Sequence, residues 1–163
     1  MCNLYVFVVL HHNHCRIVHV NVTDHPYAAW VAQQLREAFP FDDALRFLIR
    51  DNDGAYGQEV ADCLEAIGVR EAKTALASPW QNAFCERVIG TLRRDCLDHV
   101  VVLNERNLKR ILSSFLDSYH NVRCHQSLDD NSPDPREIEP PAKDKVVAVP
   151  LVGGLHHRNR RAG

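Results

Sequence analysis

The chain has 163 residues, 45% of them hydrophobic and 25% charged, which fits a globular protein large enough to bury a core. Its longest apolar stretches, such as residues 5–10, are far shorter than the roughly 20 residues that span a bilayer, so we expect no membrane segment and a cytoplasmic location. The formal net charge of −2 gives no overall attraction to nucleic acid, so a DNA contact would have to depend on local basic clusters.

The chain opens with the pattern of a β-hairpin. Residues 4–10 (LYVFVVL) and 16–22 (RIVHVNV) are rich in β-branched and aromatic residues, and the polar HHNHC between them is typical of a turn. The first run is apolar throughout, whereas the second alternates. We therefore expect the first strand to be buried on both faces and the second to be half exposed.

A helix is expected after this hairpin. Thr23 or Asp24 offers an N-cap and Pro26 a first-turn residue, and the helix should run to about Phe39 before Pro40 ends it. Its buried stripe would consist of Trp30, Val31, Leu35 and Ala38.

The middle of the chain alternates strands and helices. The patterns predict a strand at 45–50, a helix at 57–67 ended by Gly68, and a short strand at 69–73. A long helix should follow, with Ser78 as its cap and Pro79 in its first position.

The last third of the chain begins with another predicted helix, which Asn104 caps and which runs to about Val122. Residues 129–144 form a proline-rich, acidic connector that should lack regular structure. Residues 145–163 predict one or two short strands with a frayed, arginine-rich end.

The octapeptide RDNDGAYG at residues 50–57 places two carboxylates, Asp51 and Asp53, where the predicted strand 45–50 ends. A calcium loop is excluded because, counted from Asp51, its fifth and sixth positions would be Ala55 and Tyr56 instead of an oxygen ligand and glycine. By themselves these residues are compatible with an ordinary turn or with one arm of an active site.

Glu86 lies 35 positions after Asp51, inside the predicted helix that follows Ser78. Two-metal phosphoryl transfer needs carboxylates that converge from different elements, because two Mg²⁺ ions about 4 Å apart require oxygen ligands. An aspartate at a strand end facing a helix glutamate is typical of such a site. A lone helix glutamate is otherwise more often a solvated charge.

Four segments together resemble bacterial insertion-sequence transposases and integrases with the retroviral-integrase-like catalytic core. The segments are LIRDNDGAYG, SPWQNAFCERVIGTLRRDCLDHVVVLNERNL, SYHNVRCHQSLDDNSP and VGGLHHR. The resemblance implies an α/β, ribonuclease-H-like mixed sheet flanked by helices. It implies an integrase catalytic core at residues 1–125, incomplete at its N-terminus, and a C-terminal extension at 126–163.

The family's motif of two aspartates and a glutamate maps onto two positions of this chain. Its second aspartate stands five residues before an aromatic residue, which selects Asp51 with Tyr56 and leaves Asp53 as a neighbour facing solvent. Glu86 matches the final glutamate. The resemblance thus implies that Asp51 and Glu86 are catalytic metal ligands.

Three arginines near Glu86 are candidate DNA-binding residues. Arg93 follows Glu86 by two helical turns on the same face, with Gly90 between them, and similarly placed basic residues hold DNA phosphates in the family. A solvated arginine is an equal alternative. Arg87 and Arg94 point to other faces and are weaker candidates.

The segment HHNHCRIVH at residues 11–19 suggests zinc, but structural zinc sites draw their ligands from two separated pairs, and a polar hairpin turn is the better interpretation. A third possible function is a small metal-binding regulator that holds zinc through this segment, with His11 and His14 among its ligands.

The family's first catalytic aspartate has no counterpart in the chain, because residues 1–23 contain neither Asp nor Glu. In the family this residue stands on the central strand of the sheet, which precedes the strand that LYVFVVL resembles. We therefore expect the fold to lack its first, central strand and the catalysis to be impaired, as in a truncated or divided transposase frame.

The resemblance implies DNA integration and transposition through metal-dependent strand cleavage and transfer, with Mg²⁺ or Mn²⁺ as cofactor and two ions in the intact family site. The partners would be DNA, as transposon ends and target, and further copies of the chain, with no membrane. The alternative is a catalytically inactive DNA-binding or dimerising remnant of a transposase.

Overall fold

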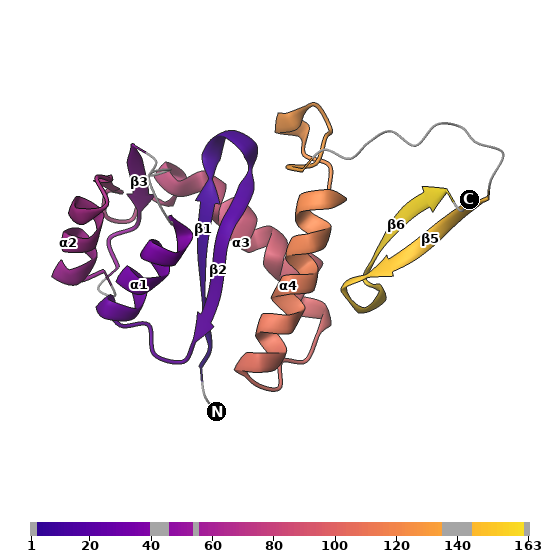
Figure 1. The fold of residues 1–163 in the computed structure, drawn as a ribbon, viewed down its shortest axis with the longest axis horizontal. Helices are drawn as coiled ribbons and strands as arrows, with labels where there is room; N and C mark the ends of the chain where they lie inside the picture. Colours follow the sequence, from indigo (N-terminus) through magenta and orange to yellow (C-terminus); the bar gives the residue numbers. More distant parts are fainter. Residues whose placement is uncertain (1–2, 40–45, 54–55, 135–144, 162–163) are drawn as a thin grey trace. The chain divides into compact units, whose positions relative to one another are not determined.

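The computed structural model describes residues 3–39, 46–53, 56–134 and 145–161 of the chain. Its strands are β1 (Tyr5–His11), β2 (Arg16–Thr23), β3 (Phe47–Arg50), β4 (Arg70–Lys73), β5 (Val146–Leu151) and β6 (His156–Arg161). Its α-helices are α1 (Ala28–Ala38), α2 (Gln58–Ala66), α3 (Ala83–Asp95) and α4 (Glu105–Asn121). The elements follow the predicted order and form a mixed α/β fold (Figure 1).

The chain divides into two compact units. Unit 1 comprises residues 1–10 and 18–88, and unit 2 comprises residues 11–17 and 89–163. This division follows spatial proximity and does not test the domain boundary predicted near residue 125, which stays a prediction.

Unit 1 is built on a core that two separate pieces of sheet share with α1 and α2. The fully buried members of this core include Val9 of β1, Leu35 of α1 and Leu64 of α2. Among the described strands, β1 pairs only with β2, and β3 pairs only with β4, in parallel. The sheet is thus divided between β1 and β3, where we expected the central strand of the family's sheet to be missing.

Two expectations for the N-terminal region are wrong. In β1 only Val9 is buried, because one face packs on the core and no described strand pairs with its second edge. Helix α1 begins at Ala28 with Tyr27 as its N-cap, not at Thr23 or Asp24, because the Thr23 hydroxyl accepts a hydrogen bond from the His25 amide (3.1 Å).

The predicted signals around the other helices of the chain are mostly confirmed. Helix α2 ends before Gly68, whose φ of +72° is the left-handed conformation that favours glycine. Asn104 caps α4, and its side chain accepts a hydrogen bond from the Asn107 amide at 2.8 Å. The segment after Ser78 differs from the prediction: it begins with a 3-10 turn, Pro79–Asn82, before α3 starts at Ala83.

Unit 2 is built around α4. Leu108, Leu112, Phe115 and Tyr119 recur at helical spacing along its buried face. The C-terminal strands β5 and β6 form an antiparallel hairpin in which Val146 pairs with Arg161. The arginine-rich end is therefore a strand as far as Arg161 and not a frayed tail. Ten of the residues predicted to form the connector, 135–144, lie outside the described residues.

Truncating Leu64 to alanine should destabilise the protein by about 2–5 kcal/mol, because the side chain is 1% exposed in the shared core of unit 1. Urea unfolding followed by circular dichroism measures the loss. Leu76→Ala is the matched control and should change stability little, since Leu76 is 82% exposed. Equal losses for the two variants would contradict this account of the core.

Candidate active site

Asp51 occupies the first position after β3, at the edge of the parallel β3–β4 pair. Its side chain is exposed, as is that of Asp53 two residues later. The Asp53 carbonyl accepts a hydrogen bond from the Tyr56 amide at 3.2 Å, which closes the segment into a turn. Gly54, the next residue of this turn, lies outside the described residues.

Arg50, immediately before Asp51, is the buried anchor of this turn. Its side chain is only 4% exposed and forms an ion pair with Glu71 of β4 at 2.5 Å. It also donates to the Asp51 carbonyl at 2.9 Å and lies 4.6 Å from the centroid of the Tyr56 ring. One guanidinium therefore ties the backbone of Asp51 and the ring of Tyr56 to the neighbouring strand.

Glu71, the acidic partner of Arg50, has a lowered pKa. Burial raises the pKa of Glu71, but hydrogen bonds from Arg50 and Lys73 outweigh this effect and keep the pKa below its usual value of 4.5. Glu71 is therefore the negative partner that engages Arg50 at neutral pH.

Glu86 lies in the first turn of α3 and is exposed. The preceding residue, Cys85, is half-buried. Burial raises the pKa of the Cys85 thiol, and the carboxylates of Glu86 and Asp51 raise it further. Burial also raises the pKa of Tyr56 to about 12, with Asp51 adding to the effect.

The two candidate ligands both influence the same thiol of unit 1, that of Cys85. Asp51 and Glu86 both act electrostatically on Cys85, although they are far apart in sequence and belong to a strand end and a helix. Cys85 and Tyr56 are kept protonated at neutral pH, so they add no charge of their own. Within the described residues no group of three His, Cys, Asp or Glu side chains is arranged to hold a metal ion.

The three candidate DNA-binding arginines of α3 are exposed. Arg93 makes no ion pair with a described residue, whereas Arg87 lies 5.5 Å from the centroid of the Phe84 ring. Arg94 folds back over Gly90, since a Cβ atom at position 90 would lie 3.0 Å from its Nη1 atom. The space beside Gly90 therefore holds Arg94.

The sequence patterns do not predict that three further residues, Arg50, Tyr56 and Cys85, are neighbours of this site. The sequence marks Tyr56 only as the aromatic residue five positions after Asp51. A charged residue at the end of the apolar run at 45–49 was the one signal for Arg50, because a buried arginine needs an acidic partner on an adjacent element. Nothing local in the sequence distinguished Cys85.

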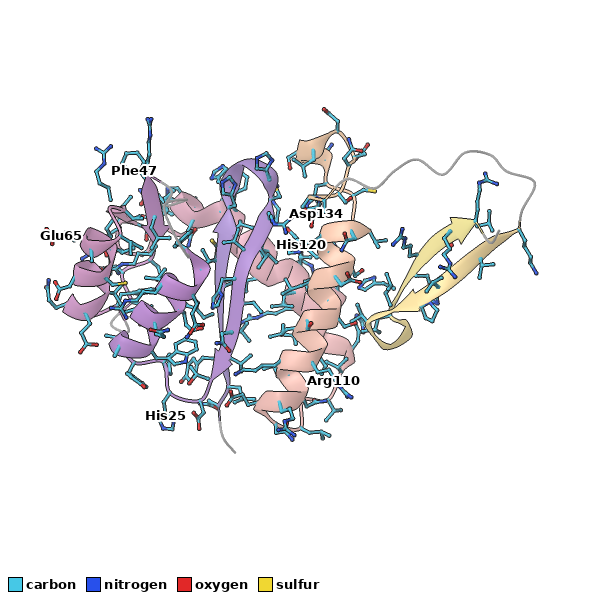
Figure 2. All side chains as sticks on the ribbon, viewed as in Figure 1. His25, Phe47, Glu65, Arg110, His120 and Asp134 are labelled. Atoms are coloured by element: carbon cyan, nitrogen blue, oxygen red, sulfur yellow. The ribbon has the colours of Figure 1, made fainter. Side chains whose placement is uncertain are left out.

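The predicted polar turn belongs to unit 2, as does His120 of α4, which Figure 2 labels. His11 and His14 stack with ring centroids 5.3 Å apart. His120 accepts a hydrogen bond from the Ile17 amide at 3.1 Å, so it joins β2 to α4. Burial is the main reason that the pKa of His120 is lowered.

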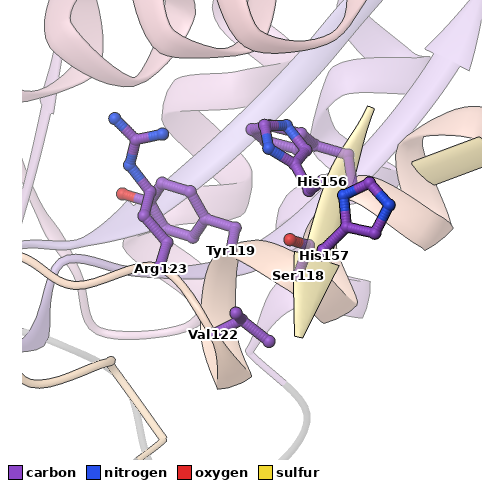
Figure 3. A pocket seen from close by; sticks show the side chains of 7 residues that line it. Ser118, Tyr119, Val122, Arg123, His156 and His157 are labelled. Atoms are coloured by element: carbon purple, nitrogen blue, oxygen red, sulfur yellow. The ribbon is translucent and has the colours of Figure 1, made fainter. Parts of the chain in front are cut away.

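Unit 2 also contains a cavity of about 140 Å³ between α4 and β6 (Figure 3). It is lined by Phe115, Ser118, Tyr119, Val122, Arg123, His156 and His157. Arg123 pairs with Asp95, whose carbonyl accepts a hydrogen bond from His156 at 2.9 Å. Neither Asp51 nor Glu86 lines this cavity. The hydrogen bond from His156 to the Asp95 carbonyl joins the β5–β6 hairpin to α3.

Residues 67–133 match the family model of the integrase core domain. The matched segment includes Glu86 and the three arginines of α3, whereas Asp51 precedes it. A comparison with curated proteins found no match.

The structure is similar to a chain of the cryo-electron microscopy structure of the simian T-cell lymphotropic virus intasome in complex with PP2A regulatory subunit B56 gamma, with a TM-score of 0.62 and 16% sequence identity. The similarity covers 97% of this chain, which spans 60% of the length of that one. The fold is thus ribonuclease-H-like, as predicted, and residues 67–133 are similar to an integrase core domain. No helix of the described residues has the length and apolarity to cross a membrane.

Replacing either candidate ligand with its amide should accelerate alkylation of Cys85. Asp51→Asn and Glu86→Gln each remove a negative charge that raises the pKa of the thiol, so a larger fraction is thiolate at pH 8. Iodoacetamide labelling followed by peptide mass spectrometry measures the rate, with the exposed Cys124 as internal reference.

Asp62→Asn is the matched control, because Asp62 is an exposed carboxylate of α2 that has no effect on Cys85. An unchanged Cys85 rate in both ligand variants would show that the two carboxylates do not converge on this thiol.

Proposed function

We propose that the chain acts in DNA integration or transposition as a core that hydrolyses a phosphodiester at a transposon end and joins the freed 3′-hydroxyl to target DNA. The observation that carries the proposal is the similarity of residues 67–133, which include Glu86, to the integrase core domain, together with the position of Asp51 directly after β3. The reaction proceeds without a covalent enzyme intermediate. Asp51 and Glu86 are proposed as its metal ligands.

The two carboxylates fit one Mg²⁺ or Mn²⁺ ion. Magnesium prefers oxygen ligands and commonly binds one or two carboxylates while it keeps several waters, and both side chains are exposed as such binding requires. When bound, the metal would supply Lewis-acid stabilisation of phosphate oxygens. Arg50 would hold the turn that carries Asp51, because it fixes the Asp51 carbonyl and is itself held by Glu71.

A second ion would need a further carboxylate. We therefore also propose that a core with these two carboxylates alone is catalytically impaired. The alternative function is a catalytically inactive protein that binds DNA or dimerises with an intact transposase.

DNA is the proposed partner, both as transposon end and as target. Arg93 is the first candidate for a phosphate contact because it is exposed on the helix that carries Glu86 and has no ion-pair partner among the described residues. Arg87 and Arg94 are secondary candidates, since each side chain lies against its own helix. We also propose that the chain acts as a homo-oligomer on paired DNA ends.

Metal binding itself should be visible at Cys85. A bound Mg²⁺ ion neutralises the carboxylates that raise the pKa of this thiol, so alkylation of Cys85 at pH 8 should become faster as MgCl₂ is added. Asp51→Asn and Glu86→Gln should abolish this response, while Asp53→Asn should retain it. A wild-type rate that does not respond to Mg²⁺ or Mn²⁺ would contradict metal binding at this pair.

A strand-transfer assay with Mg²⁺ or Mn²⁺ tests the enzymatic function. We expect weak activity in the wild-type chain, reduced to background by Asp51→Asn and by Glu86→Gln, because each variant removes one of only two ligands. Asp53→Asn is the matched control and should keep the wild-type level. DNA binding that survives both ligand substitutions, without nicking by any variant, would favour the inactive remnant.

A further inference from the structure

The cavity of about 140 Å³ in unit 2 takes no part in the candidate active site. All of its lining residues belong to unit 2, whereas Asp51 and Glu86 belong to unit 1. Protein interiors are close-packed, and voids larger than a water molecule are few in a domain. A cavity of this size is therefore a feature that calls for a ligand of matching size.

One face of α4 forms most of the wall of this cavity. Phe115, Ser118, Tyr119 and the C-cap residue Val122 lie three, four and seven positions apart, counted from the first of them, which places their side chains on one face of the helix. Three of these side chains are aromatic or apolar, and the fourth is the small side chain of Ser118. The short serine therefore leaves room between its larger neighbours.

Ser118 is a buried polar residue whose side chain lacks a partner. It is 6% exposed, and its carbonyl accepts hydrogen bonds from the Val122 and Arg123 amides, but its hydroxyl forms none with another residue in the described parts of the chain. A buried hydroxyl normally forms at least one hydrogen bond, because burial removes its hydrogen bonds to water. The labelled side chains of the cavity surround that of Ser118 (Figure 3). The Ser118 hydroxyl is therefore a group that a ligand in the cavity would satisfy.

The charged groups beside the cavity are already paired. Arg123 forms an ion pair with Asp95, whose carbonyl accepts a hydrogen bond from His156. No carboxylate of the described ranges lines the cavity itself. An ionised ligand would lose its hydration without gaining an unpaired counter-charge, so the site favours a neutral ligand.

The size and the walls of the cavity favour an aromatic ring. A cavity of about 150 Å³ with apolar walls binds benzene, and the volume here is close to that value. Phe115 and Tyr119, whose ring centroids lie 5.8 Å apart, both line the cavity, and aromatic rings attract one another in offset or edge-to-face geometry. A single ring with one polar substituent matches both the aromatic wall and the Ser118 hydroxyl.

We propose that this cavity binds a small neutral phenol, a single aromatic ring with one hydroxyl group, which forms a hydrogen bond with Ser118. A phenolic hydroxyl both donates and accepts, so it partners the serine in either direction. The ligand contacts both α4 and β6 and stabilises the folded chain by mass action. The inference does not depend on the proposed function, because no proposed metal ligand or DNA contact takes part in it.

Fluorine NMR of 4-fluorophenol titrated with the full chain tests the proposal. The wild-type chain should bind saturably with a Kd on the order of 1 mM, the affinity available to a ligand of so few atoms. Fluorobenzene, which lacks the hydroxyl, should bind about three- to tenfold more weakly, which is the effect of one net hydrogen bond. 4-Fluorobenzoate should also bind more weakly, because its charge finds no unpaired counter-charge.

Ser118→Ala removes the proposed partner of the phenol. In this variant 4-fluorophenol should bind no more tightly than fluorobenzene, so the preference for the hydroxyl is lost. Ser114→Ala is the matched control, because Ser114 is an exposed serine of the same helix, and it should keep the wild-type preference. A preference that persists unchanged in Ser118→Ala would overturn the contact with Ser118.

Val122→Phe places additional side-chain volume in the cavity and should abolish the binding of 4-fluorophenol and of fluorobenzene. Circular dichroism establishes that the variant is folded, and Ser118→Leu fills the same space if Val122→Phe does not fold. Binding that survives in a folded, filled variant would place the ligand elsewhere and overturn the proposal. The absence of saturable binding to the wild-type chain would do the same.

Two competition experiments test the class of ligand. Tighter binding of 4-fluorobenzoate than of 4-fluorophenol would overturn the assignment to a neutral molecule. Displacement of 4-fluorophenol by N-acetyltyrosinamide as readily as by phenol would assign the cavity to a tyrosine side chain of a partner protein and overturn the assignment to a free phenol. We expect phenol to be the better competitor, because the cavity has the volume of a single ring.

Discussion

The buried ion pair between Arg50 and Glu71 is the constraint on which the candidate active site depends. Strands β3 and β4 have only four residues each, so their short parallel ladder alone fixes little of the turn that follows. The Arg50 side chain adds a link across the ladder, a hydrogen bond to the Asp51 carbonyl and a contact with the Tyr56 ring. Loss of one partner would leave a desolvated charge beneath Asp51.

The same pair sets the electrostatic balance of the proposed metal site. Arg50 is the positive charge nearest in sequence to Asp51, but Glu71 occupies it, and Cys85 and Tyr56 remain neutral. The negative charges of the exposed Asp51 and Glu86 carboxylates are therefore available to attract a cation from solvent. Two such oxygen donors are enough to attract a divalent ion but leave most of its coordination to water.

Sequence patterns predicted the elements whose signals are local. They failed where the structure depends on a partner that is distant in the sequence. The cap at Asn104 and the glycine after α2 act within one turn of their helices, so both were readable. The exposure of β1 depends on which strands pair with it. The regular structure of β6 as far as Arg161 depends on its pairing with β5. Arg50 escaped prediction because its partner, Glu71, is 21 residues away.

Unit 1 is held together by side-chain packing more than by a continuous ladder. The β1–β2 and β3–β4 pieces share no strand pairing among the described residues, yet Val9, Leu48 and Val69 contact one core with α1 and α2. Apolar burial is non-directional, so it tolerates a divided sheet that hydrogen bonds alone would not. Metal coordination is directional and depends on each ligand. Packing of this kind can therefore maintain the fold independently of the number of ligands that the proposed metal site holds.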